Sequence, residues 1–387
     1  MPKKEELPNP AAQQADNTFH QASVETIESK FEIDPQVLNR KAVETISAAG
    51  YEIDEATAPY KLFGSRNRFF IRKCRDSENN EVVVKIAAPD SSSVGDVEKE
   101  TMTISIVQNA LERARSAGKQ LTIHFPEKVG EIRAGEMRGL VTRFIQDDKV
   151  AKQHLSADDR VHMLRRIITD IQQLDVPDEI LRQQGPHWEQ QIPVKTGEVH
   201  VNQIVYALEG MLSEILTPEE SGEIRDIFAQ YKALIDTFPL RFSHCDMHAE
   251  NIMYELTPES SSRITLIDLE ALCVDNEFSD WAMLATLSEV APKFGGYDEE
   301  VADFVEEIKR IGLDKDSAKL GAAIEREVII PHPRGKDAKI VYLLMCIESC
   351  LDKFTDVSKK TDRISQILSE VYVELLRERV RKIRELS

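Results

Sequence analysis

Hydrophobic and polar positions follow two different patterns along the chain. Short runs of β-branched and aromatic residues at 69–71 and 82–84 flank the polar segment 76–80, which is typical of a β-hairpin. Two further strands are predicted on either side of the turn at residues 134–136. From about residue 156 onward the apolar residues recur mainly at helical spacing. The pattern therefore predicts an α+β protein, with a small antiparallel sheet followed by a mainly helical region.

Start and stop signals mark the ends of several expected helices. Asp34 as N-cap, Pro35 in the first turn and Gly50 after the last turn predict an N-terminal helix. Thr217 and Glu220 have the spacing of a capping box. The last helix carries an apolar stripe that predicts docking onto the protein rather than a free coiled coil. The stripe consists of Ile364, Ile367, Leu368, Val371, Leu375, Leu376, Val380 and Ile383.

Composition narrows the class of protein. The 387 residues are 41% hydrophobic and 30% charged, which is typical of a globular chain with a sizeable core. The net charge of -19 repels phosphates and argues against a nucleic-acid partner. No apolar run reaches the roughly 18 residues of a membrane span. The five cysteines are scattered and form no CxxC pair, so we expect small buried thiols in a reducing, cytoplasmic location.

The candidate chemistry lies in a β-rich segment at residues 240–269. An apolar strand leads into a polar loop that carries His244, Asp246 and Asn251. Asp268 ends a second apolar strand, where an unpaired buried carboxylate would be costly. We therefore expect the acidic side chains to face a cleft or a cation, because reactive groups are commonly placed on loops at strand ends.

Phosphoryl transfer needs these residue types. One carboxylate accepts or orients the proton of the attacking hydroxyl, while an amide oxygen and a second carboxylate hold Mg²⁺. A lysine on a strand neutralises the phosphates, and an acid on a helix positions that lysine. Asp246, Asn251, Asp268, Lys85 and Glu100 supply these parts in the chain order of a kinase-like fold.

Five segments carry a resemblance to a known family. HCDMHAEN at 244–251 resembles the HGDLHPGN motif of the aminoglycoside phosphotransferase and choline kinase superfamily, and IDLE at 267–270 resembles its IDWE or IDFE motif. DWA at 280–282 is similar to the D-L-A that follows. VVVKI at 82–86 resembles the strand of the nucleotide lysine, and LVTRFI at 140–145 the hinge. The resemblance implies a bilobal protein-kinase-like fold, with a small antiparallel β-sheet N-lobe and a mainly helical C-lobe.

The same resemblance implies a division of the chain. We expect a disordered tail at 1–20, an N-terminal helical extension at 21–57, the nucleotide-binding N-lobe at 58–145, and the helical C-lobe with the catalytic loop and metal-binding strand at 146–387.

The implied cofactors are ATP and Mg²⁺. Asp246 would be the catalytic base or orient the hydroxyl, and Asn251 and Asp268 would be the metal ligands. Lys85 would contact the α- and β-phosphates and pair with Glu100, for which Glu98 is the less apolar alternative.

The remaining implied contacts concern the nucleotide. The carbonyl of Arg143 and the N–H of Ile145 would bind adenine, and the loop at 64–67, with Ser65, would cover the phosphates. Cys245 stands where the family has glycine, and Ala249-Glu250 replaces Pro-Gly. His244 is interpreted as a brace for the loop backbone, and Glu270 as additional charge near the metal.

Three alternatives remain open. The pattern of His244, Asp246 and His248 also permits a metal-dependent hydrolase, although only His332 follows as a further imidazole. A pseudokinase would bind nucleotide without transfer, but the complete set of base and metal ligands argues against it. A protein kinase would need a long activation segment, and fewer than ten residues follow the metal motif before helical patterning resumes near Glu277.

A small-molecule hydroxyl acceptor is therefore favoured over a protein. A cluster of acidic residues in the C-terminal region is compatible with an acceptor that carries an amine, such as an aminoglycoside or choline, but a solvated helix face is the favoured explanation of it. The cluster consists of Asp298, Glu299, Glu300, Asp303, Glu306 and Glu307. The low aromatic content, 6%, places a choline acceptor behind an amine or sugar hydroxyl.

Overall fold

The structure is a computed structural model. It describes residues 34–62, 68–89, 91–147, 157–182, 192–247, 249–256, 262–293, 317–358 and 363–387. Residue contacts divide the chain into two compact units. The first comprises Met1–Thr101 and Lys128–Phe144, and the second comprises Met102–Glu127 and Ile145–Ser387.

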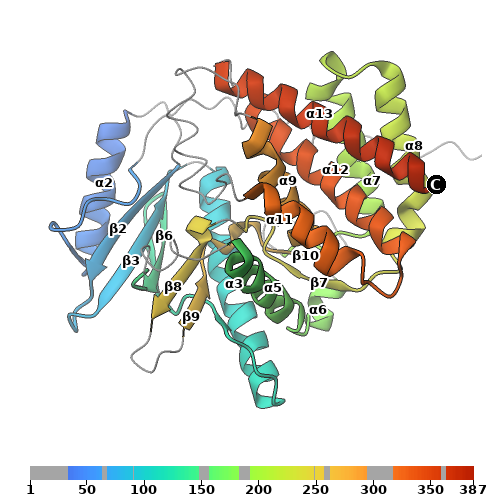
Figure 1. Cartoon of the computed structure of the whole chain (residues 1–387). Helices are drawn as coiled ribbons and strands as arrows, with labels where there is room; N and C mark the ends of the chain where they lie inside the picture. Colours follow the sequence, from blue (N-terminus) through green and yellow to red (C-terminus); the bar gives the residue numbers. More distant parts are fainter. Residues whose placement is uncertain are drawn as a thin grey trace, which may run out of the picture. The chain divides into compact units, whose positions relative to one another are not determined.

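A five-stranded antiparallel sheet forms the centre of the first unit, in the order β1-β2-β3-β6-β5 (Figure 1). The expected hairpin is confirmed: β2 pairs with β3 across a turn in which Asp76 Oδ1 accepts the backbone N–H groups of Glu78 and Asn80 at 3.0 and 2.8 Å. The second expected hairpin, around residues 134–136, is confirmed as β5 and β6. The strands are β1 (Glu52–Ile53), β2 (Phe69–Arg75), β3 (Glu81–Ala87), β5 (Lys128–Ala134) and β6 (Met137–Arg143).

Helix α2 (Pro35–Ala48) begins and ends as its sequence predicts. Asp34 caps it by accepting the N–H of Gln36 at 2.8 Å, and Gly50 follows it with φ +86°. The helix buries Leu38, Ala42 and Ile46 completely. They share one apolar cluster with side chains of the sheet, among them Phe70, Cys74, Val82, Val84, Ile86 and Val141.

These contacts change the expected domain boundaries. The helical extension expected at 21–57 is not separate where the structure describes it, because α2 packs in the core of the first unit and β1 pairs with β2. The expected N-lobe, 58–145, also differs from the observed unit, which includes α2 and excludes residues 102–127. Helix α3 (Ser91–Ser116) crosses from the first unit to the second between Thr101 and Met102. The tail expected at 1–20 lies outside the described residues.

Two small sheets lie within the second unit. Strands β7 (Leu240–Ser243) and β10 (Cys273–Asn276) pair antiparallel. Strand β9 (Ser262–Leu266) pairs antiparallel with β8 (Ile252–Leu256) and parallel with the short β4 (Ile123–His124). The β-rich segment predicted at 240–269 is thereby confirmed, and its strands frame the loop that carries the candidate chemistry.

Helices make up most of the rest of the second unit. The predicted capping box at the start of α8 is confirmed, since Thr217 and Glu220 exchange backbone and side-chain hydrogen bonds at 2.9 and 3.2 Å. The helices are α5 (Ala157–Gln172), α6 (Asp178–Leu181), α7 (Gly197–Glu209), α8 (Pro218–Ile235), α9 (Ser279–Lys293), α11 (Ser317–Ile324), α12 (Lys336–Ser358) and α13 (Arg363–Leu386).

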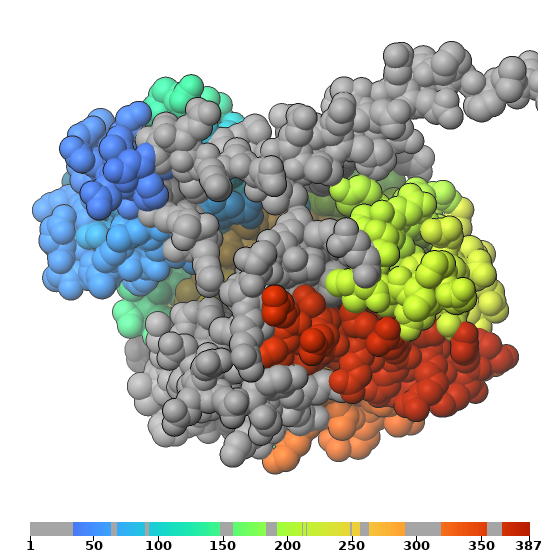
Figure 2. All heavy atoms as spheres, turned by 90° about the horizontal axis from the view of Figure 1, so that it is seen from above, coloured from blue at the N-terminus to red at the C-terminus, as the bar shows by residue number. Residues whose placement is uncertain are grey.

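The C-terminal helix α13 is docked, as its apolar stripe predicts. From Ile367 to Ile383 every described member of the stripe is buried. Figure 2 shows α13 (red) along α8 (yellow-green), and Arg377 Nε lies 2.7 Å from Glu220 Oε1 across this contact. Arg379, 2% exposed, pairs with Glu289 of α9. None of the helices in the described parts of the chain has the length and apolarity that crossing a membrane requires.

Candidate active site

Strand β7 leads directly into the loop that holds the candidate base. At its start, the backbone N–H groups of His244 and Cys245 donate to the two carboxylate oxygens of Asp280 at 3.1 and 3.0 Å. Asp280 lies in the first turn of α9 and is 2% exposed. Burial raises the pKa of Asp280, and the two backbone donors oppose that shift. The loop is thus anchored to the start of a helix.

The ring of His244 braces the same loop, in agreement with its interpretation as a structural imidazole. It is completely buried, and its Nε2 lies 3.0 Å from the carbonyl oxygen of Ile267. The N–H of Ile267 donates in turn to the carbonyl oxygen of Asn251 at 2.9 Å. Both backbone groups of Ile267 are therefore bound to the loop, which fixes the position where Asp268 begins.

Asp246 and Asn251 are brought together. Asn251 Nδ2 donates to the carbonyl oxygen of Asp246 at 2.9 Å and to its Oδ2 at 3.2 Å. Asn251 is 4% exposed, so these bonds hold its side chain in one orientation. Because the amide nitrogen is used on Asp246, the amide oxygen is the atom that Asn251 can offer to a cation.

Asp268 has an unusual backbone conformation, with φ 60° and ψ 59°. Non-glycine residues adopt this left-handed conformation infrequently, and aspartate is among those that tolerate it best. The carboxylate oxygens of Asp268 and Glu270 approach within 4.8 Å of each other. Together with Asn251, the donor set consists of oxygen atoms, which fits Mg²⁺ and does not favour softer metals.

A lysine that the sequence analysis missed also contacts the candidate base. Lys353 Nζ, on α12, lies 3.5 Å from Asp246 Oδ1, and the two side chains are 24% and 33% exposed. No local motif marks Lys353, because α12 is far from the loop in sequence. Its ammonium group places a positive charge beside the Asp246 carboxylate.

The first unit holds a buried ion pair. Lys85 of β3 and Glu100 of α3 are 8% and 4% exposed, and Lys85 Nζ lies 2.8 Å from Glu100 Oε2. Lys85 Nζ also lies 4.2 Å from the centre of the Phe69 ring. The alternative acid, Glu98, lies 3.7 Å from Arg138 instead and is 41% exposed. The structure thus pairs Lys85 with the predicted acid.

The expected hinge coincides with the boundary between the units. Strand β6 ends at Arg143, the N–H of Phe144 still bonds to Glu81, and the second unit begins at Ile145. Arg143 Nη1 lies 3.9 Å from Asp76 Oδ2. Ser65, His248 and the acidic cluster at 298–307 lie outside the described residues.

A buried charge network close to the loop was also missed by sequence reasoning. His200 of α7 lies between two acids: its Nδ1 contacts Glu348 of α12, and its Nε2 lies 3.0 Å from Asp275 Oδ1 of β10. Lys195 Nζ lies 3.0 Å from Glu348 Oε1 and 3.7 Å from Asp275 Oδ2. The four charges balance, and they connect α7, α12 and β10.

Burial and pairing oppose each other in this network. Burial alone would lower the pKa of His200, but Glu348 and Asp275 raise it to about 10. Burial would raise the pKa of Glu348, but His200 and Lys195 lower it to about 2. His200, Lys195 and Glu348 are therefore charged at neutral pH.

The fold resembles that of solved aminoglycoside phosphotransferases, and it is a protein-kinase-like fold with a five-stranded antiparallel sheet followed by a mainly helical region. The GDP complex of aminoglycoside 2'-phosphotransferase-IIIa has a TM-score of 0.51 at 12% identity over 89% of this chain and 99% of that one. The GDP and kanamycin complex of APH(2")-IIIa gives 0.51 at 12% identity, over 88% and 99%.

A third similar structure is a thermostable mutant of aminoglycoside phosphotransferase APH(4)-Ia in a ternary complex with ADP and hygromycin B. Its TM-score is 0.50 at 11% identity, over 90% of this chain and 97% of that one. No family model matches the sequence, and no curated protein sequence matches it significantly. The predicted fold class is confirmed, while identities this low carry no activity over to this chain.

Proposed function

We propose that the protein transfers the γ-phosphoryl group of ATP to a hydroxyl group of a small molecule. The observation that supports this best is the loop after β7. There the Asn251 amide holds Asp246 at 2.9 and 3.2 Å, and the Asn251 carbonyl is bound to Ile267, directly before Asp268. These are the residue types that phosphoryl transfer requires, in a fold shared with aminoglycoside phosphotransferases.

Each residue of the second unit has one task in this proposal. Asp246 accepts or orients the proton of the acceptor hydroxyl. The amide oxygen of Asn251 and the carboxylate of Asp268 would hold Mg²⁺, which when bound neutralises phosphate charge. Lys353, 3.5 Å from Asp246, adds a cation beside the reacting oxygens. Catalysis would then consist mainly of positioning and charge neutralisation.

The first unit would bind the rest of the nucleotide. Lys85 contacts the α- and β-phosphates, and Glu100 holds the ammonium group in place at 2.8 Å. The backbone of Arg143, at the end of the first unit, and that of Ile145, at the start of the second, would bind the base. Ser65, outside the described residues, is proposed to contact the phosphates. Because solved structures with this fold contain GDP as well as ADP, guanine nucleotides belong in the test.

The acceptor in this proposal is a small hydroxyl compound. The similar structures with kanamycin and hygromycin B make aminoglycosides the first class to try, followed by sugars and amino alcohols. Transfer into protein substrates is the competing outcome.

The test is a screen for ADP or GDP release with Mg²⁺ against aminoglycosides, macrolides, sugars, amines and amino alcohols. Asp246→Ala is expected to abolish transfer while leaving ATP affinity within about twofold, because the base does not hold the nucleotide. Asp268→Ala is expected to remove Mg²⁺-dependent ATP binding. Asp226→Ala, an exposed aspartate of α8, is the matched control.

The outcomes separate the alternatives. Unchanged turnover in Asp246→Ala or Asp268→Ala contradicts the assigned roles. ATP binding without turnover on every acceptor favours a pseudokinase. Zinc retained by the purified protein together with no ATP binding favours a metal-dependent hydrolase.

A further inference from the structure

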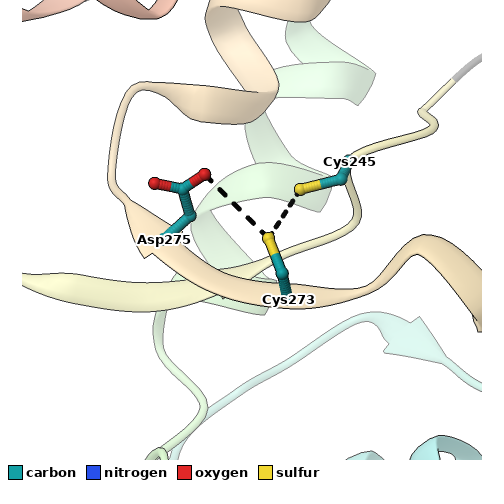
Figure 3. A group of neighbouring side chains, drawn as sticks. All are labelled: Cys245, Cys273 and Asp275. Atoms are coloured by element: carbon teal, nitrogen blue, oxygen red, sulfur yellow. Dashed lines mark hydrogen bonds between the residues drawn. The ribbon is translucent and has the colours of Figure 1, made fainter. Parts of the chain in front are cut away.

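Two free thiols face each other beside the candidate base. Cys245 Sγ lies 2.7 Å from Cys273 Sγ, and Figure 3 shows the two sulfur atoms pointing at one another. Cys245 follows β7 in the loop, directly before Asp246, and Cys273 opens β10. The two strands are antiparallel neighbours, with Cys273 opposite Ser243. The pair is therefore held by the sheet.

Asp275 lies beside the two thiols, and the three side chains together could hold a metal ion, but the distance between the sulfur atoms argues against one. Two thiolates on one tetrahedral zinc ion would stand about 3.8 Å apart, given Zn–S bonds of about 2.3 Å. The observed 2.7 Å is nearer to the roughly 2.05 Å of a disulfide. Asp275, the third member of the group, is already used: its Oδ1 lies 3.0 Å from His200, and its Oδ2 lies 3.7 Å from Lys195.

We infer that Cys245 and Cys273 are an oxidation site for hydroperoxides, at which a reversible disulfide ties the catalytic loop to β10. The hydroperoxide first oxidises the Cys245 thiol to a sulfenic acid, and its O–O bond breaks to leave water from hydrogen peroxide or an alcohol from an organic hydroperoxide. Cys273 Sγ then attacks Cys245 Sγ, the S–O bond breaks, and the Cys273 proton leaves with the hydroxide as water. In total the two thiols lose two protons and two electrons to one peroxide.

The surroundings assign different roles to the two thiols. Cys245 is half-buried, so peroxide reaches it first, whereas Cys273 is 2% exposed. The hydrogen bond with Cys245 and burial both raise the pKa of Cys273 well above its ordinary value. Cys273 is therefore a poor primary target and acts as the resolving thiol.

The disulfide would act on the reaction through the position of Asp246. Closing the sulfur distance from 2.7 Å pulls on the backbone of Cys245, which already has φ 59°. Because displacements below 1 Å can reduce catalysis strongly, we expect at least about a tenfold loss of transfer in the oxidised protein. This consequence, unlike the disulfide itself, rests on the proposed function.

Peptide mapping of the full chain tests the inference directly. Tryptic cleavage after Arg241, Arg263 and Lys293 places the two cysteines on adjacent peptides, 242–263 and 264–293, each with a single cysteine. The reduced protein is treated with hydrogen peroxide, the remaining thiols are alkylated, and the digest is analysed by mass spectrometry. The expected product is a cross-link of the two peptides, about 2 Da lighter than their sum, that dithiothreitol reverses.

Variants and controls separate this pair from other cysteines. Cys273→Ser should form no cross-link and should leave Cys245 as a sulfenic acid that dimedone traps. Cys74→Ser, which removes a buried thiol of β2, should form the cross-link as the wild type does. Both peptides fully alkylated after peroxide treatment, or zinc bound by the untreated pair, would overturn the inference. Peroxide should also leave the turnover of Cys245→Gly unchanged. If the cross-link forms but the reduced protein also lacks transfer activity, the result would count against the proposed function and not against the disulfide.

Discussion

Replacing Glu348 with glutamine tests the buried charge network. The substitution keeps the shape of the side chain and removes the negative charge of Glu348, which leaves Asp275 as the one remaining carboxylate of the network. Breaking a buried ion pair at one partner costs about 3–5 kcal/mol. Because glutamine retains hydrogen-bonding capacity, we expect the free energy of unfolding to fall by about 3 kcal/mol, at the lower end of that range.

Tryptophan fluorescence during urea unfolding measures this effect in the right part of the chain. Both tryptophans, Trp188 and Trp281, belong to the second unit. For a slope of up to about 3 kcal/mol per molar urea, the expected loss lowers the midpoint by at least about 1 M. Glu385→Gln on the exposed side of α13, whose carboxylate is 4.0 Å from Arg381, is the matched control and should lose under about 0.5 kcal/mol.

The pH profile gives a second, independent readout. The pKa of His200 is about 10 in the folded protein and near 6.5 in the unfolded chain. Its contribution to the free energy of unfolding is therefore full below pH 6.5 and is lost as the pH rises toward 10. The pKa of Glu348 is about 2 against 4.5, so its contribution is full above pH 4.5 and is lost as the pH falls toward 2. Glu348→Gln should therefore flatten the decline above pH 6.5. A loss no larger than the control's, or a profile parallel to the wild type, would refute the network's role.

Three further predictions concern the first unit and the loop. Glu100→Leu removes the carboxylate 2.8 Å from the buried Lys85 ammonium group, so it should lower the free energy of unfolding by about 3 kcal/mol. Lys85→Met combined with Glu100→Leu should recover most of that stability yet weaken ATP binding at least about tenfold. Thermal unfolding and ATP titration check this, and a double variant that still binds ATP normally contradicts it. Cys245→Gly should raise the free energy of unfolding by up to about 1 kcal/mol, because glycine adopts φ 59° without strain. Cys245→Val should lower it by at least about 1 kcal/mol. Equal effects of the two substitutions in urea unfolding would argue against a strained backbone at Cys245. Gly139→Ala would put a Cβ 2.5 Å from Ile86 Cδ1, so the free energy of unfolding should fall by about 1–3 kcal/mol. Unchanged thermal unfolding would show that the Ile86 side chain moves aside at no cost.

Local structure followed from neighbouring residues. The helix ends at Asp34 and Thr217, the turn at 76–80 and the stripe of α13 were all predicted correctly. Backbone hydrogen bonds, caps and side-chain periodicity depend on residues a few positions apart, so their patterns can be read from a single sequence.

The candidate site could be predicted only where its parts are short motifs. Asp246 and Asn251 are five positions apart and share a recognisable loop, and the structure joins them by hydrogen bonds. Their chemical roles, and those of Lys85, Glu100, Ser65, Arg143, Ile145 and Asp268, remain predictions.

Contacts between distant segments could not be predicted from the sequence. His200 and Glu348 are 148 positions apart, and the approach of Lys353 to Asp246 and of Cys245 to Cys273 likewise depends on how α12 and β10 pack. Such pairs leave no periodic or spacing signal, because long-range packing, and not the local backbone, brings their side chains into contact. The same reason explains why α2 was expected to be a separate extension: its apolar face was visible in the sequence, but the sheet that covers it was not.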